Sequence, residues 1–195
     1  MRKIVVLLPV FILALFYLKV SAGLRDKTSL VFSVCIMFII MIIGVYRTKQ
    51  ESLLQACIQS SFLIYVFGVL TLTGYFMLFR ELAAHGWWHK LLHRIQTKDK
   101  INLQPFLMFK QFQIASTQVI GNLVMLLPLG IYIPLLFPRL AGFFKVCIIC
   151  LSVSVSIELM QLITNARSTD IDDVILNTSG AIVGYIIYKV LRLIN

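Results

Sequence analysis

Half of the eight acidic residues in this 195-residue chain lie in one short stretch, "IELMQLITNARSTDIDDVILN" (157–177). These four residues are Glu158, Asp170, Asp172 and Asp173. Arg167 lies among them, and both flanks are almost wholly apolar. A buried carboxylate can act as a general base, and carboxylate oxygens can hold a divalent cation. The stretch is therefore the first candidate for a functional site.

Helical spacing gathers these residues and their polar neighbours into two stripes. The first stripe contains Ser154, Glu158, Gln161 and Asn165, and the second contains Asp170, Asp173, Asn177, Gly180 and Gly184. Gly180 and Gly184 form a G-x-x-x-G, which permits close contact between membrane helices. We expect an antiparallel hairpin whose two helices meet through these stripes. Glu158 should then lie within ion-pair reach of Arg167 or Arg80.

Helix capping explains part of the cluster without any function. Asp170 follows two hydroxyl residues and is a natural N-cap, and Asp172 and Asp173 lie in the first turn, where the helix dipole favours anions. Glu158 differs because it lies one to two turns inside an apolar helix. Ionisable residues at such depth are costly and are candidates for function. A structural Glu158, paired with an arginine, is the alternative.

The composition indicates that lipid surrounds most of the chain. It is 59% hydrophobic and 13% charged, whereas soluble domains carry about 25% charged residues. Six stretches approach the length of a membrane span: 4–20, 29–46, 57–79, 119–137, 143–163 and 174–190. They show no alternation of period two, so helices are expected rather than a barrel. The predicted fold is an all-α, multi-pass bundle of about six transmembrane helices in the cell membrane.

The two N-terminal helices are expected to form a separate part, residues 1–50, from a membrane domain at 51–195. The first segment, "MRKIVVLLPVFILALFYLKVSAG", also has the pattern of a cleaved signal peptide. Lys19 near its end is unusual for that alternative, and we expect a retained helix. The net charge of +10 comes from Lys and Arg between the spans. This placement favours contact with anionic membrane lipids and argues against nucleic acid as a partner.

The longest polar segment, residues 80–118, contains "HGWWHKLLHRI". Its pattern predicts an amphipathic interfacial helix near 85–95, with Trp88, Leu91, Leu92 and Ile95 on one face and Lys90 and Arg94 opposite. His85, His89 and His93 are spaced as zinc ligands on one flank could be, although a solvated polar flank explains them equally well. No metal or other cofactor is expected.

Two further features belong to the predicted spans. Pro128 should bend the fourth span, with either a cavity or neighbouring side chains beside the bend. Cys147 and Cys150 form a C-x-x-C inside an apolar helix without a partner pair nearby. Cysteines in such a setting act as small buried apolar residues.

With six spans, the polar residues fall on one face of the membrane. The candidate ligand-binding residues are Arg80, Asn102, Asn122, Glu158, Gln161, Arg167, Asp170, Asp173 and Asn177; the catalytic candidates among them are Glu158, Asp170 and Asp173. The numbers of Lys and Arg on the two sides are similar, so the positive-inside rule does not fix the orientation.

Three separated blocks carry a resemblance to a known family. The blocks are "NLQPF" (102–106), "NLVMLLPLG" (122–130) and "IELMQLITNARSTDIDDVILNTSGAIVGY" (157–185). In this order they resemble the VanZ-like membrane proteins, over about residues 57–190. One departure is Leu127, where the family often has an aromatic residue. The resemblance implies a bacterial cell-envelope protein linked to low-level resistance to the glycopeptide teicoplanin, with the polar face outside.

Three functions fit these residues. The first is a non-enzymatic protein that binds a lipid, a cell-wall precursor or the lipoglycopeptide itself, with Arg80 and Arg167 meeting phosphates. The second is an intramembrane hydrolase or transferase acting on a lipid phosphate, with Glu158 as general base and with Asp170 and Asp173 able to hold a divalent metal through their oxygens. The third is a transporter that carries protons on Glu158, which the lack of a visible inverted repeat disfavours.

Overall fold

The computed structural model describes residues 39, 52–107, 117–164 and 168–194. The chain divides into two compact units, residues 1–67 with 188–195 and residues 68–187. The second unit contains every candidate site residue that the structure describes. The division expected between residues 50 and 51 stays a prediction.

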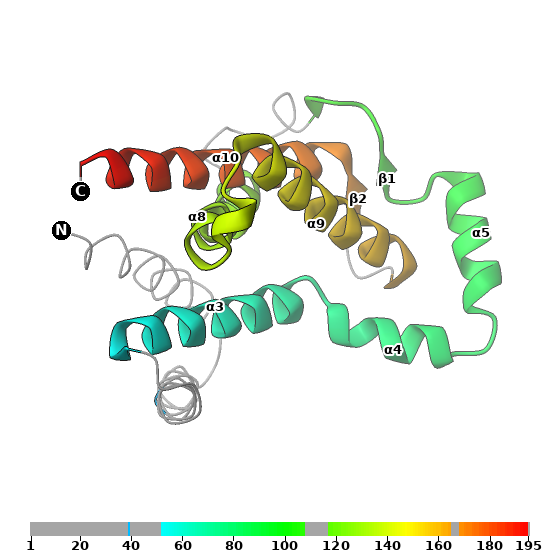
Figure 1. Cartoon of the computed structure of the whole chain (residues 1–195). Coiled ribbons are helices and arrows are strands. Elements are labelled where there is room, and N and C mark those ends of the chain that lie inside the picture. The colour runs from blue at the N-terminus through cyan, green and yellow to red at the C-terminus, as the bar shows by residue number, and fades with distance from the viewer. Residues whose placement is uncertain (1–38, 40–51, 108–116, 165–167, 195) are drawn as a thin grey trace. The chain divides into compact units, whose positions relative to one another are not determined.

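Helices dominate the described part of the chain (Figure 1). They are α3 (Leu53–Leu72), α4 (Tyr75–Ala83), α5 (Trp87–Thr97), α7 (Thr117–Met125), α8 (Leu127–Leu136), the 3-10 turn η1 (Pro138–Leu140), α9 (Phe143–Thr164) and α10 (Ile171–Leu193). Two short strands, β1 (Ile101–Asn102) and β2 (Thr169–Asp170), pair in parallel. Ile101 lies opposite Thr169 in this pair, and Asn102 lies opposite Asp170.

Four helical segments are long and apolar enough to cross a membrane: α3, the combined α7 and α8, α9 and α10. They correspond to the last four of the six spans that the sequence predicts. The first two predicted spans, 4–20 and 29–46, lie outside the described residues except for Ile39. The predominantly helical fold is therefore confirmed, with four helices long and apolar enough to cross a membrane, and the total of six spans stays a prediction.

The bounds predicted for the third span, 57–79, are wrong at both ends, because α3 begins at Leu53 and ends at Leu72. A capping box opens α3: the Ser52 hydroxyl accepts the Gln55 N–H at 3.3 Å, and Gln55 Oε1 accepts the Ser52 N–H at 3.2 Å. The helix ends at Leu72 because Gly74 takes a left-handed conformation with φ 79°. The remainder of the predicted span belongs to α4, which packs beside α9.

The bend expected in the fourth span is present. Leu126 has φ −98° and ψ 1°, which separates α7 from α8, and Pro128 follows in the first turn of α8. Every residue from Pro128 to Pro134 is buried. This stretch of α8 is therefore buried along its whole length, as expected for a helix that is apolar on every face.

The glycine pair of α10 faces this bent span and not the hairpin partner that we expected. A Cβ at Gly180 would overlap the carbonyl oxygen of Leu123, and one at Gly184 would overlap that of Leu127. Gly130 of α8 likewise meets the backbone of Ala181. The expectation that the G-x-x-x-G packs on α9 is wrong, because a close backbone approach can be made to any neighbouring helix.

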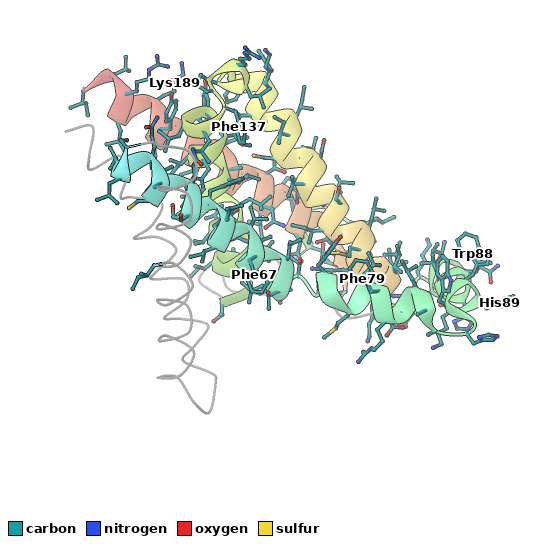
Figure 2. All side chains as sticks on the ribbon, turned by 60° about the horizontal axis from the view of Figure 1, so that its bottom comes forward. Phe67, Phe79, Trp88, His89, Phe137 and Lys189 are labelled. Carbon is teal, nitrogen blue, oxygen red and sulfur yellow. The ribbon has the colours of Figure 1, made fainter. Side chains whose placement is uncertain are left out.

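The outer faces of the helices are apolar. On α9 an exposed stripe contains Phe144, Ile148, Leu151, Val155 and Leu159. The aromatic side chains of Phe79 on α4, Trp88 on α5 and Phe137 between α8 and η1 are exposed as well (Figure 2). Exposed apolar faces of this extent suit contact with lipid.

Candidate functional site

Three aspartates at the start of α10 each accept a hydrogen bond from a different segment of the chain. We call Asp170, Asp172 and Asp173 the aspartate hub. Both carboxylate oxygens of Asp170 lie 3.0 Å from Nδ2 of Asn102, which donates to them from β1. The first block of the sequence resemblance is thus fixed to the third.

The other two hub aspartates are more deeply buried. Asp172 is fully buried, and its Oδ1 accepts the backbone N–H of Phe106 at 2.5 Å. Phe106 has φ 65°, so this bond holds a backbone conformation that non-glycine residues rarely adopt. Asp173 Oδ1 accepts a hydrogen bond from Nδ2 of Asn122 on α7. Asn122 brings the second block of the resemblance to the same place.

Asp170 also caps α10, as the capping interpretation predicts. Its Oδ1 accepts the N–H of Asp172 at 2.9 Å, a bond of the N-cap to N2 type. Its own N–H donates to Oε2 of Glu158 at 2.9 Å. Glu158 is 5% exposed and reaches the hub from α9. The polar stripes of the two helices therefore meet at Glu158 and Asp170.

The short parallel strand pair fixes which residues of the segment around Asn102 lie opposite the aspartate hub. The N–H of Thr169 donates to the carbonyl of Lys100 at 2.9 Å. Asn102 Oδ1 accepts the N–H of Gln104 at 3.1 Å, which leaves the Asn102 Nδ2 directed at Asp170. Both ends of the Asn102 amide are therefore used to hold the loop against α10.

The two candidate arginines do not share this environment. Arg80 lies on α4 with a largely exposed side chain, and its Nη2 is 3.7 Å from Oε1 of Glu81. The ion pair proposed between Arg80 and Glu158 is therefore not formed, because Arg80 points to the surface instead. Arg167, the other proposed partner of Glu158, lies outside the described residues.

Arg94 is the buried arginine of this region, and it closes the end of α9. Its Nη1 donates to the backbone carbonyls of Gln161 and Leu162 at 3.0 and 2.6 Å. Its Nε donates to the backbone carbonyl of Asp99 at 3.1 Å, and its Nη2 to that of Lys100 at 3.4 Å. The last carbonyls of a helix lack internal partners, and a cation there also complements the helix dipole. Burial lowers the pKa of the Arg94 guanidinium and the nearby Asp99 opposes this shift, yet arginine stays protonated.

Several buried polar atoms on the two stripes have no hydrogen-bond partner in the described part of the chain. They are Ser154 Oγ, Gln161 Oε1 and both amide atoms of Asn177. Asn177 is 1% exposed and Gln161 is 2% exposed. Such groups are rare in native proteins because each costs free energy when left unsatisfied.

The zinc alternative required His85, His89 and His93 to lie along one face of a single helix, and the structure does not place them so. His85 lies in the turn before α5, so the three histidines do not share one helix face. Within the described ranges, no group of three or more His, Cys, Asp or Glu side chains is arranged to hold a metal ion. Cys150 is buried and Cys147 half-buried in α9, which agrees with a packing role.

Asp172 and Arg94 are not among the candidate ligand-binding residues that the sequence predicts. Asp172 belongs to the acidic stretch, but the helix dipole alone explains it there, and its place next to Asp173 in the third block is the signal for a further role. The sequence pattern puts Arg94 with Lys90 on the polar face of the predicted interfacial helix. No sequence feature distinguishes an arginine that turns inward from one that remains in water.

The described part of the chain defines a class: a helical protein with four helices long and apolar enough to cross a membrane and a buried polar cluster shared by α9 and the start of α10. The sequence profile of the VanZ/LLP1 family matches residues 62–192. The chain therefore belongs to the VanZ/LLP1 family. No curated protein and no solved structure matches it.

Proposed function

We propose that this protein is a multi-pass cell-envelope protein that binds an amphiphile, either a membrane lipid or a lipid-linked cell-wall precursor, at the outer face of the membrane. In bacteria this binding would contribute to tolerance of the lipoglycopeptide teicoplanin. The proposal combines membership of the VanZ/LLP1 family with the chemistry of the polar cluster.

The unsatisfied buried amides carry the proposal. Gln161 and Asn177 keep polar atoms inside an apolar bundle without a hydrogen-bond partner among the described residues. Asn177 follows Asp173 by one helical turn, and Gln161 follows Glu158 by three residues. A ligand with hydrogen-bonding groups would satisfy these amides and offset the cost of burying them.

The hydrogen bonds of the carboxylates favour binding over catalysis. Asp170 already accepts from Asn102 and from the N–H of Asp172, and Glu158 accepts the N–H of Asp170. A general base needs a carboxylate oxygen directed at the proton that it removes. In this arrangement the carboxylates hold three segments of the chain together.

The test is Asn177→Leu, which removes an unsatisfied amide at similar volume. We expect the variant to unfold at a higher temperature than the parent and to lose teicoplanin tolerance at equal membrane abundance. Asn122→Leu is the matched control, because its amide is bonded to Asp173 and its loss should lower the unfolding temperature. A more stable Asn177→Leu with full tolerance would show that the amide meets no ligand.

A lipid mass spectrum separates binding from catalysis. Membranes with and without the protein should contain the same lipid species if the protein only binds. A species that appears or disappears with the parent, but not with Glu158→Gln, would instead support the hydrolase or transferase.

A further inference from the structure

The segment that follows α5, residues 98–106, holds its backbone in unusual conformations. In the described ranges the non-glycine residues with positive φ are Lys98 at 54°, Lys100 at 53° and Phe106 at 65°, and all three lie in this segment. A side chain in the left-handed region places Cβ close to the following carbonyl oxygen. Such conformations persist only where the surrounding structure holds them, and they cluster at functional positions. We call residues 98–106 the strained loop.

The strained loop exposes two large apolar side chains. Leu103 is 70% exposed and Phe106 is 57% exposed, with the exposed Gln104 and Pro105 between them. A single exposed apolar residue needs no explanation. Here two lie three residues apart, and one of them is held outward on strained backbone. The fold therefore presents these side chains and does not merely leave them uncovered.

Buried polar groups fix the strained loop on both sides of Leu103. Before it, Asn102 Nδ2 donates to both oxygens of Asp170 at 3.0 Å. After it, the Phe106 N–H donates to Oδ1 of the fully buried Asp172 at 2.5 Å. Both acceptors belong to the aspartate hub. The hub thus acts as a rigid mount for an exposed apolar tip.

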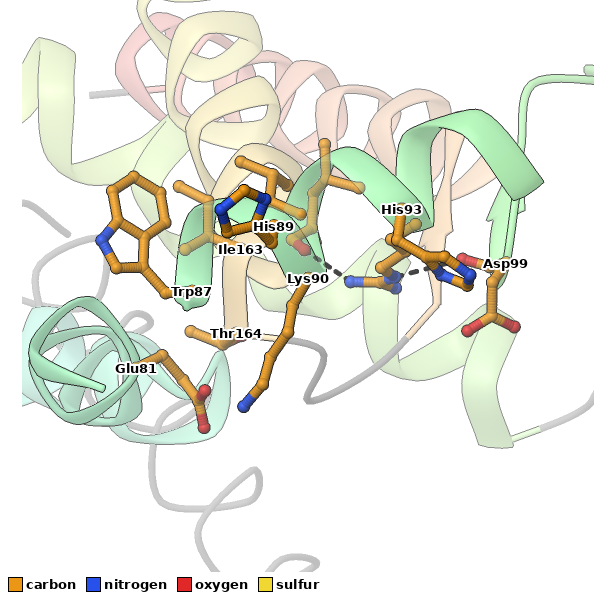
Figure 3. A pocket seen from close by; sticks show the side chains of 11 residues that line it. Glu81, Trp87, His89, Lys90, His93, Asp99, Ile163 and Thr164 are labelled. Atoms are coloured by element: carbon orange, nitrogen blue, oxygen red, sulfur yellow. Dashed lines mark hydrogen bonds between the residues drawn. The ribbon is translucent and has the colours of Figure 1, made fainter. Parts of the chain in front are cut away.

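The strained loop lies at the level where membrane-crossing helices end. Its hub contacts are made at the start of α10, whose membrane-crossing length begins at Ile171. Its first residues are held to the end of α9, because Arg94 donates to the backbone of both Asp99 and Leu162, the contacts marked by dashed lines in Figure 3. Residues at the ends of spans meet the headgroup region of a bilayer.

A cavity of about 810 Å³ adjoins the beginning of the strained loop, between α4, α5 and the end of α9 (Figure 3). We call it the α5 cavity. Asp99 and Glu81 line it together with Lys90 and Arg94, so its acidic and basic side chains are balanced. The cavity wall therefore favours neither an anion nor a cation, and the exposed loop is the more specific feature.

The exposed charges around the apolar tip are mainly basic. Lys98 and Lys100 of the strained loop and Lys90 of α5 are exposed, and Asp99 is the exposed acidic residue of the same region. Exposed lysines beside apolar side chains suit an anionic membrane surface, where the apolar groups enter the acyl boundary and the cations meet the headgroups. This charge balance and the position at the span ends both favour lipid as the partner.

We propose that the strained loop inserts Leu103 and Phe106 into the headgroup–acyl boundary of an anionic leaflet, with Lys98 and Lys100 at the lipid headgroups. Asn102 is a positioning residue, since it fixes the loop to the hub. The inference goes beyond the proposed function. It assigns the loop a partner, the bulk leaflet, that is separate from an amphiphile bound at the buried amides.

The test measures the depth of single tryptophans in the full chain reconstituted into vesicles. Trp87→Phe with Trp88→Phe removes both native indoles. Leu103→Trp and Phe106→Trp then report on the tip, and Leu103→Trp avoids the position with positive φ. Phosphatidylcholine brominated near the carbonyl end of its acyl chains should quench most of their emission, whereas acrylamide in water should quench little.

Thr97→Trp is the matched control, because Thr97 is exposed in the last turn of α5, half a turn around the helix from Trp88. We expect acrylamide to quench it strongly and brominated lipid to quench it weakly. Bromine quenching of both tip reporters no greater than that of the control would overturn the proposal. Protection of the tip from both quenchers would also overturn it, because a protein segment or a second copy of the chain would then cover the loop.

Two further variants separate the mount from the charges. Asn102→Ala should move the tip reporters towards water, with less bromine quenching, and an unchanged depth would contradict the role of the hub. Brominated phosphatidylglycerol should quench the tip more than brominated phosphatidylcholine. Lys100→Gln should weaken this preference by up to about fivefold, the effect of one basic residue near an anionic surface.

Lys145→Gln removes the same charge near the beginning of α9, at the opposite end of that helix from Arg94, and should leave the preference unchanged. An equal loss in both lysine variants, or no preference in the parent, would overturn the anionic part of the proposal. The proposed function is tested separately by the teicoplanin tolerance of Asn177→Leu. A tip that stays in water while Asn177→Leu still loses tolerance would contradict this inference alone.

Discussion

The aspartate hub and the α5 cavity lie in the same unit of the chain and use charge in opposite ways. In the hub, each carboxylate is bonded to donors from another segment, and Asp172 and Asp173 are buried. In the cavity between α4, α5 and the end of α9, Lys90, His89 and His93 line the wall together with Glu81 and Asp99. The comparison teaches that the acidic cluster, the more conspicuous feature of the sequence, is largely committed to structure. The cavity wall beside it carries two basic and two acidic side chains, Lys90, Arg94, Glu81 and Asp99.

Arg94 joins the two regions. It forms part of the cavity wall, and it donates to the carbonyl of Lys100, whose carbonyl also accepts from Thr169. Through the strand pair this contact extends to Asp170. Substitutions can therefore be chosen to affect the hub alone or both regions together.

The largest effect is expected from Gly180→Ala, which should break the hub and leave the cavity. A methyl group here meets the Leu123 backbone, which cannot move aside as a side chain can. It should separate α10 from α7, where Asn122 bonds Asp173, and lower the free energy of unfolding by about 3 kcal/mol. Thermal unfolding in micelles measures this change.

Gly121→Ala on α7 is the control for Gly180→Ala. A Cβ at Gly121 meets nothing within 4 Å, so alanine should leave stability unchanged or raise it slightly. Equal destabilisation by both variants would mean that α7 and α10 do not pack through Gly180.

An intermediate effect is expected from Arg94→Lys, which should loosen both regions. Lysine keeps the charge but loses the fork that reaches several carbonyls at once. The cost should be about 2 kcal/mol, typical of hydrogen bonds to a charged group. A variant as stable as the parent would contradict the role of Arg94 at the end of α9.

The smallest effect is expected from Asp170→Asn. Asparagine caps a helix nearly as well as aspartate, so the bond to the Asp172 N–H survives. One of the two oxygens facing Asn102 becomes a donor, which should cost about 1 kcal/mol. Thermal unfolding in micelles measures this cost. A loss of stability as large as that of Gly180→Ala would contradict the interpretation of Asp170 as a cap.

Some of this arrangement follows from the periodicity of single helices. The spacing of Ser154, Glu158 and Gln161 predicts one buried stripe on α9, and the structure buries all three. The pattern of residues 85–95 predicts an amphipathic helix, and α5 forms at 87–97. Pro128 predicts a bend, because a proline removes a backbone donor wherever its helix lies. Such properties belong to one segment and need no knowledge of its neighbours.

Other features required the tertiary structure, because they depend on which segment lies opposite. The G-x-x-x-G of α10 predicts a close backbone contact, but its partner is the bent span of Leu123 and Leu127 and not α9. Arg80 and Arg94 are the same residue type in the same polar region, yet one is exposed and the other is buried at the end of α9. A side chain's type fixes the bonds that it can make. Only the packing of distant segments determines which bonds it does make, because the free carbonyls of α9 and the N–H of Phe106 are brought within reach by the fold.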